Sequence, residues 1–321
     1  MIRYFGALLV MIGILGGYCV YYFSAPGPLA EPKNVLFKKG TGFLEIVEQM
    51  EEAGVIRHRH LFTVLAVLSG DARRFKAGEY RFSAAISPRL VMEMIAEGRV
   101  VVHKITVPEG FTMRQTLKLL AEQELLEGVV ALKVPEGSLL PQTYHYVYGD
   151  QRQEIINRMQ AAMQETMSEL WPKRAKDLPF DTPQEALILA SIVERETSLD
   201  HEYGRVAAVY INRLRKGMKL QADPTVIYGL ELEKGEPLGR LLTLNDLKID
   251  TPHNTYTREG LPPTPIANPG RSAIEAVLNP PQTNELYFVA TGTGGHYFAR
   301  TYQEHLRNVA RYRAEIKEQK P

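Results

Sequence analysis

The sequence predicts an α+β protein that begins with a transmembrane helix. Three patterns carry this prediction. An uncharged apolar run covers residues 4–23, a β-α-α-β order of elements fits residues 34–82, and helical stretches precede a hairpin-like segment within residues 182–301. The chain has 321 residues, and because domains average about 150 residues, this length suggests two domains.

The composition is that of an ordinary globular protein. Apolar residues make up 45% of the chain and charged residues 23%, which excludes a collagen-like or wholly disordered chain. The 38 basic and 37 acidic residues nearly cancel, and no long block of one sign occurs. We therefore expect no nucleic acid as a partner, because phosphate binding needs clustered basic residues. The single Cys19 excludes an intramolecular disulfide and a multi-cysteine metal site.

Residues 4–23 are predicted to cross a membrane. They contain no charged residue, and twenty residues at about 1.5 Å rise span about 30 Å, the thickness of a hydrocarbon core. Aromatic residues gather at both ends, as in an interfacial belt. Arg3 precedes the run and Glu31 is the first charge after it, so residues 1–3 are expected to be a short cytoplasmic end. The competing interpretation is a cleaved signal peptide, but no A-x-A-like site follows the run.

The part beyond the membrane is predicted to begin with a proline-rich, extended spacer at residues 24–33. Strand patterns at 35–37 and 79–82 enclose two amphipathic stretches. A strand at 100–107 then leads to a Gly-Thr turn and another helix, which indicates either an internal duplication or common β-to-α turn chemistry. A connecting helical region at 111–180 follows.

A helix starting at Thr182 is predicted to end in two carboxylates. Thr182 and Glu185 fit a capping box, and the next eight residues are apolar on every side, as in a buried helix. Desolvation at the end of such a helix raises a carboxyl pKa, which prepares a general acid. The alternative is a solvated helix end with Glu194 and Glu196 in surface ion pairs. The two side chains point about 200° apart, so we expect at most one in a given cleft.

Loops after this helix carry polar candidates for substrate binding. Asp223 precedes a proline and is predicted to cap a short helix, while Gln221 lies on the loop before it, where it can face a ligand. A proline-rich irregular segment at 251–270 contains Asn254 and Tyr256, and it is either functional or a rigid cover. The histidines show no metal-ligand spacing, so neither a metal nor a cofactor is expected.

Taken together, these motifs resemble the YceG-type family of endolytic murein transglycosylases. The match runs in order through most of residues 182–300 and rests on ASIVERET (190–197), YINRL (210–214), GMKLQADPTVIYG (217–229), NTYT (254–257), GLPPTPIANPG (260–270) and LYFVATGTGGHYF (286–298).

The resemblance implies a layout for the whole chain. It implies a single-pass protein of the inner membrane, anchored through residues 4–23, with its C-terminal part in the periplasm. Residues 34–110 would form a LysM-like βααβ region, and residues 181–321 a mixed α/β catalytic domain. Its substrate would be peptidoglycan glycan strands, and peptidoglycan synthases would be its partners.

The resemblance also assigns the site. The family's catalytic glutamate is the first acidic residue of its S-I-V-E-x-E-T motif, which here is Glu194. Motif positions expected to line the cleft with it are Glu196, Gln221, Asp223, Asn254 and Tyr256. Gln142 stands where the family often has an acidic residue, so the segment 141–144 is assigned no catalytic part.

A single catalytic carboxyl favours lytic cleavage over hydrolysis, which needs two carboxylates across the bond. Glu194 would protonate the oxygen between N-acetylmuramic acid (MurNAc) and N-acetylglucosamine (GlcNAc), and then deprotonate the muramyl C6 hydroxyl. The product is a 1,6-anhydro-MurNAc end, formed by an intramolecular attack that gains from proximity. Such cleavage of nascent strands would terminate their elongation. The alternative is a non-catalytic, membrane-tethered scaffold that binds peptidoglycan.

Overall fold

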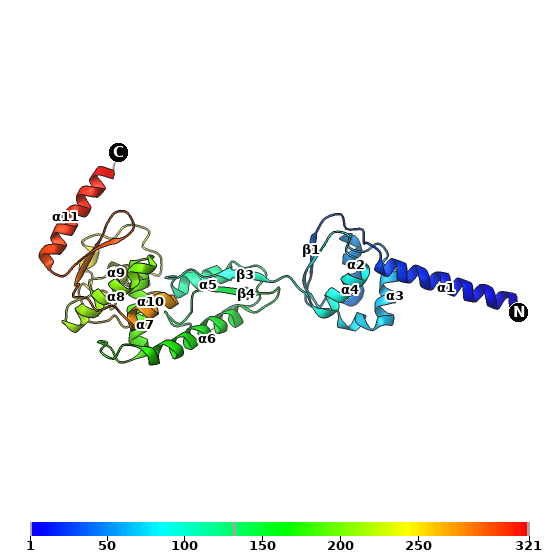
Figure 1. Cartoon of the computed structure of the whole chain (residues 1–321), viewed down its shortest axis with the longest axis horizontal. Coiled ribbons are helices and arrows are strands. Elements are labelled where there is room, and N and C mark those ends of the chain that lie inside the picture. Colours follow the sequence, from blue (N-terminus) through cyan, green and yellow to red (C-terminus); the bar gives the residue numbers. More distant parts are fainter. Residues whose placement is uncertain (1, 131–132, 320–321) are drawn as a thin grey trace. The chain divides into compact units, whose positions relative to one another are not determined.

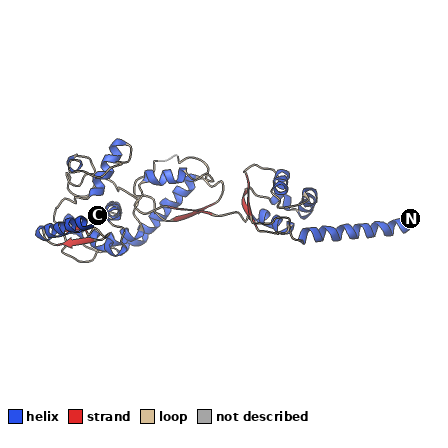
Figure 2. Ribbon diagram, turned by 90° about the horizontal axis from the view of Figure 1, so that it is seen from above, coloured by secondary structure: helices blue, strands red, loops and turns tan. Residues whose placement is uncertain are grey.

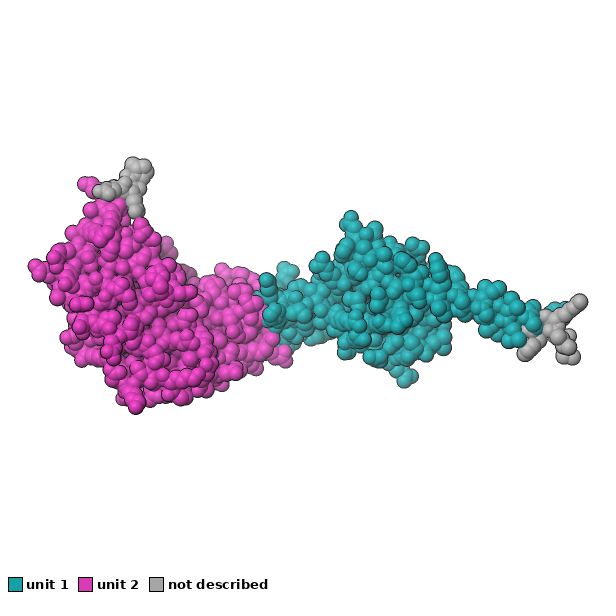
Figure 3. Space-filling model, viewed as in Figure 1, with its two compact units in different colours: residues 1–105, 124–127, 145–151 teal, residues 106–123, 128–144, 152–321 magenta. Residues whose placement is uncertain are grey.

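The computed structural model describes residues 2–130 and 133–319 (Figure 1). The chain divides into two compact units (Figure 3): unit 1 contains residues up to 105 together with 124–127 and 145–151, and unit 2 contains the remainder. Helices dominate both units, and the strands come in two-stranded pairs (Figure 2). The architecture is a mixture of helices and small sheets, in agreement with the predicted fold class.

The predicted N-terminal helix is α1, Ile2–Ser24. Its segment Gly6–Ser24 is long and apolar enough to cross a membrane, and almost none of it is buried by the rest of the protein. Apolar side chains such as Val10 and Ile14 are therefore exposed. Because such a surface is unfavourable in water and suited to lipid, α1 fits a single-pass membrane anchor.

Unit 1 has the predicted β-α-α-β order. Strand β1, Lys33–Phe37, pairs antiparallel with β2, Gly78–Phe82. Between them lie α2, Phe43–Glu52, and α3, Arg59–Ser69, followed by the 3-10 helix η1, Asp71–Arg74. Helix α4, Pro88–Glu97, completes the unit. Its core is made by the inward faces of these elements and includes Phe37, Met50, Phe62, Tyr80, Phe82 and Ile95.

The segment predicted as a spacer packs onto unit 1. The Gly27 N–H donates to the Ala85 carbonyl, and the Ala85 N–H donates to the Leu29 carbonyl. Leu29 is buried in the core of the unit. A side chain at Gly27 would overlap the Ile86 carbonyl, so this close approach requires glycine.

The connecting region is built from short elements. Strand β3, His103–Thr106, pairs with β4, Thr143–Tyr146. The strand predicted over 100–107 is shorter because residues 100–102 emerge from a left-handed turn at Gly98. Helix α5, Met113–Ala121, begins with a capping box at Thr112, and α6, Arg152–Leu170, ends in the 3-10 helix η2, Trp171–Lys173.

Helices α7, Pro183–Glu196, α8, Asp200–Arg215, and α10, Arg271–Leu278, pack against one another at the centre of unit 2 (Figure 1). The predicted capping box of α7 is confirmed, with Thr182 and Glu185 bonded reciprocally. Every residue from Ala186 to Glu194 is buried, as the apolar pattern requires.

Further elements surround this core. Helix α9, Asp223–Lys234, and the 3-10 helix η3, Asp246–Lys248, come before the proline-rich loop. The predicted hairpin is confirmed by β5, Tyr287–Ala290, paired antiparallel with β6, His296–Ala299. Helix α11, Tyr302–Gln319, packs against both strands of this hairpin.

Candidate active site

Glu194 lies in the last turn of α7 and is only 8% exposed. The Tyr203 hydroxyl of α8 donates to Glu194 Oε1 at 2.7 Å, and the Gly270 N–H, at the start of α10, donates to Oε2 at 2.8 Å. Burial raises the pKa of the Glu194 carboxyl, and the two hydrogen bonds oppose that rise. The alternative of a solvated glutamate in a surface ion pair is therefore wrong for Glu194.

A groove of about 270 Å³ opens beside this carboxyl and is lined by Glu109, Gly110, Glu194, Arg195, Glu196, Thr197 and Ser198. The loop before α5 forms its opposite edge. Gly110 has φ +75°, and a Cβ there would lie 3.6 Å from Glu194 Cγ. The loop is held in place by Asn268, because the Gly110 N–H donates to the Asn268 carbonyl and the Asn268 N–H donates to the Phe111 carbonyl.

Glu196 is half-buried, and its Oε1 accepts a 2.6 Å hydrogen bond from the Tyr210 hydroxyl. Burial raises the pKa of Glu196 to about 7. The tyrosine partners of Glu194 and Glu196 lie seven residues apart on α8, about 10 Å along its axis, so the two carboxyls diverge as predicted. Both residues nevertheless line the same groove, contrary to expectation, because α7 ends at Glu196 and Thr197 continues in an extended conformation.

A second groove, of about 170 Å³, brings together four of the residues predicted to bind substrate: Glu196, Gln221, Asp223 and Tyr256. The Tyr256 hydroxyl donates to Asp223 Oδ1 at 2.6 Å. The prediction that Asp223 caps a helix is wrong. Ala222 is the N-cap of α9, Asp223 is the first helical residue, and no side chain caps this helix end. Its carboxylate is thereby directed to the tyrosine.

Arg213 is a member of this second groove that sequence reasoning missed. Its guanidinium is largely buried and donates to the backbone carbonyls of Lys219, Leu220 and Leu286, and to Gln221 Oε1 at 3.2 Å. Gln221 itself has φ +52°, a left-handed conformation that costs energy in a non-glycine residue. Arg213 therefore supports the strained turn that presents Gln221.

Asn254 contacts Tyr256 but lines neither of these two grooves. Its amide is buried and donates to the Leu247 and Ile249 carbonyls, while its Oδ1 accepts from the Tyr256 N–H at 2.8 Å. With these groups paired, its side chain shapes the loop that carries Tyr256, and Asn254 lines a further groove along the proline-rich loop.

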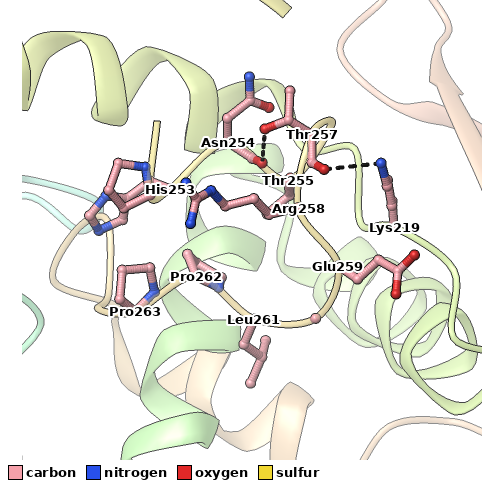
Figure 4. A pocket seen from close by; sticks show the side chains of 12 residues that line it. Lys219, His253, Asn254, Thr255, Thr257, Arg258, Glu259, Leu261, Pro262 and Pro263 are labelled. Carbon is pink, nitrogen blue, oxygen red and sulfur yellow. Dashed lines mark hydrogen bonds between the residues drawn. The ribbon is translucent and has the colours of Figure 1, made fainter. Parts of the chain in front are cut away.

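A third, larger groove of about 620 Å³ follows the proline-rich loop and contains neither Glu194 nor Glu196. Figure 4 shows how its wall is held, with the Thr257 hydroxyl donating to the Asn254 carbonyl and Lys219 Nζ donating to the Thr257 carbonyl. Within residues 2–130 and 133–319, no three His, Cys, Asp or Glu side chains converge as metal ligands.

A buried, hydrogen-bonded carboxyl at a groove, beside a second groove of polar and aromatic residues, is the arrangement expected of an acid–base enzyme that acts on a polar substrate. The chain belongs to the YceG-like family, whose sequence profile matches residues 35–311.

Individual relatives agree with this assignment. The chain is 28% identical to the endolytic murein transglycosylase of Bacillus subtilis (strain 168), with 93% of this chain and 91% of that protein covered. It is 27% identical to the endolytic murein transglycosylase of Streptococcus pneumoniae serotype 2 (strain D39). That match includes 95% of this chain but only 64% of the relative's length. The crystal structure of a YceG-like protein from Listeria monocytogenes has a TM-score of 0.53 and 30% identity, covering 87% of this chain and 99% of that one.

Proposed function

We propose that this chain is a membrane-anchored endolytic murein transglycosylase that cleaves the MurNAc–GlcNAc bond of peptidoglycan strands and leaves 1,6-anhydro-MurNAc ends. It is an enzyme of the lytic transglycosylase class, as its curated relatives are. The observation that carries the proposal is the Glu194 carboxyl, which is buried, held by two hydrogen bonds and open to a groove.

The chemistry requires one carboxyl in two roles. Protonated Glu194 gives its proton to the glycosidic oxygen as the muramyl C1–O bond breaks, and GlcNAc leaves with a free hydroxyl. The muramyl C6 hydroxyl then attacks C1 and passes its proton to the Glu194 carboxylate. Between the two steps, the Tyr203 hydroxyl and the Gly270 N–H stabilise the carboxylate. No water enters the product, because the attacking hydroxyl belongs to the same sugar.

The second groove is the proposed place for neighbouring sugars of the strand. Gln221, Asp223 and Tyr256 offer hydrogen bonds and an aromatic face to hydroxyl and acetamido groups, and Glu196 lies at the border of both grooves. A polymer that passes through the first groove would thereby also be held by the second groove, next to the scissile bond.

The cellular role follows from the anchor. We place residues 1–3 in the cytoplasm, α1 in the inner membrane and the catalytic domain, residues 181–321, in the periplasm. An enzyme tethered there would meet nascent strands and end their elongation, beside the synthases that make them. The LysM-like character of residues 34–110, and glycan binding by this region, remain predictions.

The decisive experiment compares the full-length protein in detergent with its Glu194→Gln variant on purified sacculi. We expect anhydro-muropeptides from the wild type and at least a 100-fold lower yield from the variant, since a general acid contributes about 10²–10⁴-fold. Glu165→Gln, an exposed position on α6 that lines none of the described grooves, is the matched control.

The products separate the alternatives. Reducing ends instead of anhydro ends would mean hydrolysis, and binding without any product would mean a scaffold. Full activity of a folded Glu194→Gln variant would assign the acid to another residue.

A further inference from the structure

A second carboxylate, Glu109, faces the groove of Glu194 from the opposite edge. It lies on the loop between β3 and α5, and its side chain is exposed. Within the part of the chain that the structure describes, its carboxyl makes no hydrogen bond and no ion pair. A carboxylate that serves no structural contact yet lines the same groove as the proposed acid is available for substrate.

Gly270 lies beside both the Glu194 and the Glu109 carboxyl groups. Its N–H donates to Glu194 Oε2, and its Cα lies so close to Glu109 that a Cβ at this position would overlap Glu109 Oε1. The two carboxyls therefore approach the same backbone residue. Since only glycine leaves this space free, the residue at 270 determines whether Glu109 lies beside Glu194.

The surrounding charges add to the effect of this neighbour. Asp200 of α8 acts on Glu109 as a second negative group, and the Tyr203 hydroxyl donates to Glu194. Arg195 opposes them, although its Nη1 donates to the Gly110 carbonyl. Arg271 of α10 is paired with Glu169 and Glu275. Partial desolvation and Asp200 raise the pKa of the Glu109 carboxyl as well, but Glu109 is exposed whereas Glu194 is buried, and the charge of Glu109 adds to the rise in the pKa of Glu194. Glu196 lines the same groove, but its carboxyl is bonded to Tyr210.

We propose that Glu109 is the second carboxylate of the active site, whose charge keeps the proton on Glu194 until substrate binds and then faces the positive charge that develops at the muramyl C1. The bonds broken and formed are those of the proposed reaction, and Glu109 neither gains nor loses a proton. The inference rests on the proposed function.

The test is the pH dependence of anhydro-muropeptide release by the full-length enzyme. Glu109→Gln keeps the size of the side chain and removes its charge. We expect kcat to fall about 10- to 100-fold with KM within about twofold. The alkaline side of the profile should move about one pH unit lower, because Glu194 ionises more easily without its neighbour. Glu109→Asp should keep the wild-type alkaline side.

A second variant tests the geometry. Gly270→Ala keeps the N–H but displaces the Glu109 carboxyl, so it should lower kcat as Glu109→Gln does, and it should add less than about twofold in a Glu109→Ala background. The inference would be overturned if active Glu109→Gln kept the alkaline side of the wild-type pH profile. It would also be overturned if Gly270→Ala lowered kcat equally in the wild-type and Glu109→Ala backgrounds. Both tests use variants that still release anhydro-muropeptides. If the proposed function itself is wrong, the wild type will release none.

Discussion

The environment of Glu194 balances two opposed requirements of its proposed roles. Burial at the end of an apolar helix favours the protonated form that an acid needs. The Tyr203 hydroxyl and the Gly270 N–H favour the ionised form that a base needs. Since burial is the larger effect, the pKa of the carboxyl is raised, yet the carboxylate left after proton donation still has two donors.

Removing one donor should shift this balance in a measurable direction. Tyr203→Phe deletes a hydrogen bond that lowers the pKa of Glu194, so the alkaline side of the activity profile should move to higher pH, opposite to the shift expected for Glu109→Gln. We expect kcat to fall about 10- to 100-fold, because a hydrogen bond to a charged group contributes about 1.5–3 kcal/mol. The measurement is the rate of anhydro-muropeptide release between pH 5 and 9.

Tyr210→Phe is the matched control, since its hydroxyl binds Glu196 instead. A Tyr203→Phe profile that coincides with the wild type would show that this hydroxyl has no effect on the catalytic carboxyl.

Helix α8 organises the end of α7. Tyr203 and Tyr210 lie two turns apart on α8, and the hydroxyl of each donates a hydrogen bond to one of the two glutamates of α7. The half-buried carboxyl of Glu196 is costly in its charged form, because the Tyr210 hydroxyl and the nearby charge of Arg195 offset only part of the lost hydration. The contact between these helices should therefore depend on pH.

Glu196 should make unit 2 less stable as the pH rises. Its pKa is about 7 in the folded chain against an ordinary value of 4.5, so between these values the folded state holds a proton that the unfolded state has lost. Stability then falls as the pH rises through this window, by about 3 kcal/mol in total, since one pKa unit corresponds to about 1.4 kcal/mol. Glu196→Gln should remove this dependence and be more stable than the wild type at pH 8.

Urea unfolding of the full-length protein, followed by the fluorescence of the single Trp171, measures this effect in unit 2. Glu165→Gln should behave as the wild type at every pH. If the wild type and Glu196→Gln lose stability equally between pH 4.5 and 8, the carboxyl is not the cause.

For the molecule as a whole, α1 supports the proposed location at a membrane. Apart from its C-terminal end, which contacts unit 1, its apolar side chains are exposed, and such a surface is suited to lipid. Residues 27–29 pack onto unit 1 directly after it. If α1 is the proposed anchor, unit 1 lies near the membrane surface, because little free chain separates the two.

The mass of the protein isolated from membranes tests the anchor against a cleaved signal peptide. We expect a chain that still contains residues 4–23 and that resists extraction by alkaline carbonate. Ile12→Asp with Ile14→Asp should reduce membrane retention, because a charge at the centre of a membrane helix costs about 2.5–3.5 kcal/mol. The control is Ile12→Leu with Ile14→Leu. A mature chain that begins after Ser24 would contradict the anchor.

Features that depend on near neighbours in the chain could be predicted from sequence. The apolar run of α1, the capping box of α7 and the hairpin of β5 and β6 all follow from interactions within a few residues. The cap assigned to Asp223 shows the limit of this approach, because a distant partner, Tyr256, takes its carboxylate instead.

Sequence alone thus specified several of the helices, the hairpin and a buried helix that ends in two glutamates, since periodicity and capping are local, but it predicted neither α10 nor α11. It left open how far each glutamate carboxyl is buried and which groups surround it. Those were decided by tertiary packing, which brings Tyr203 from nine residues away and the Gly270 N–H from 76 residues away to Glu194. Glu109 enters the groove in the same way, because α10 and the loop before α5 meet only when the core of unit 2 has closed.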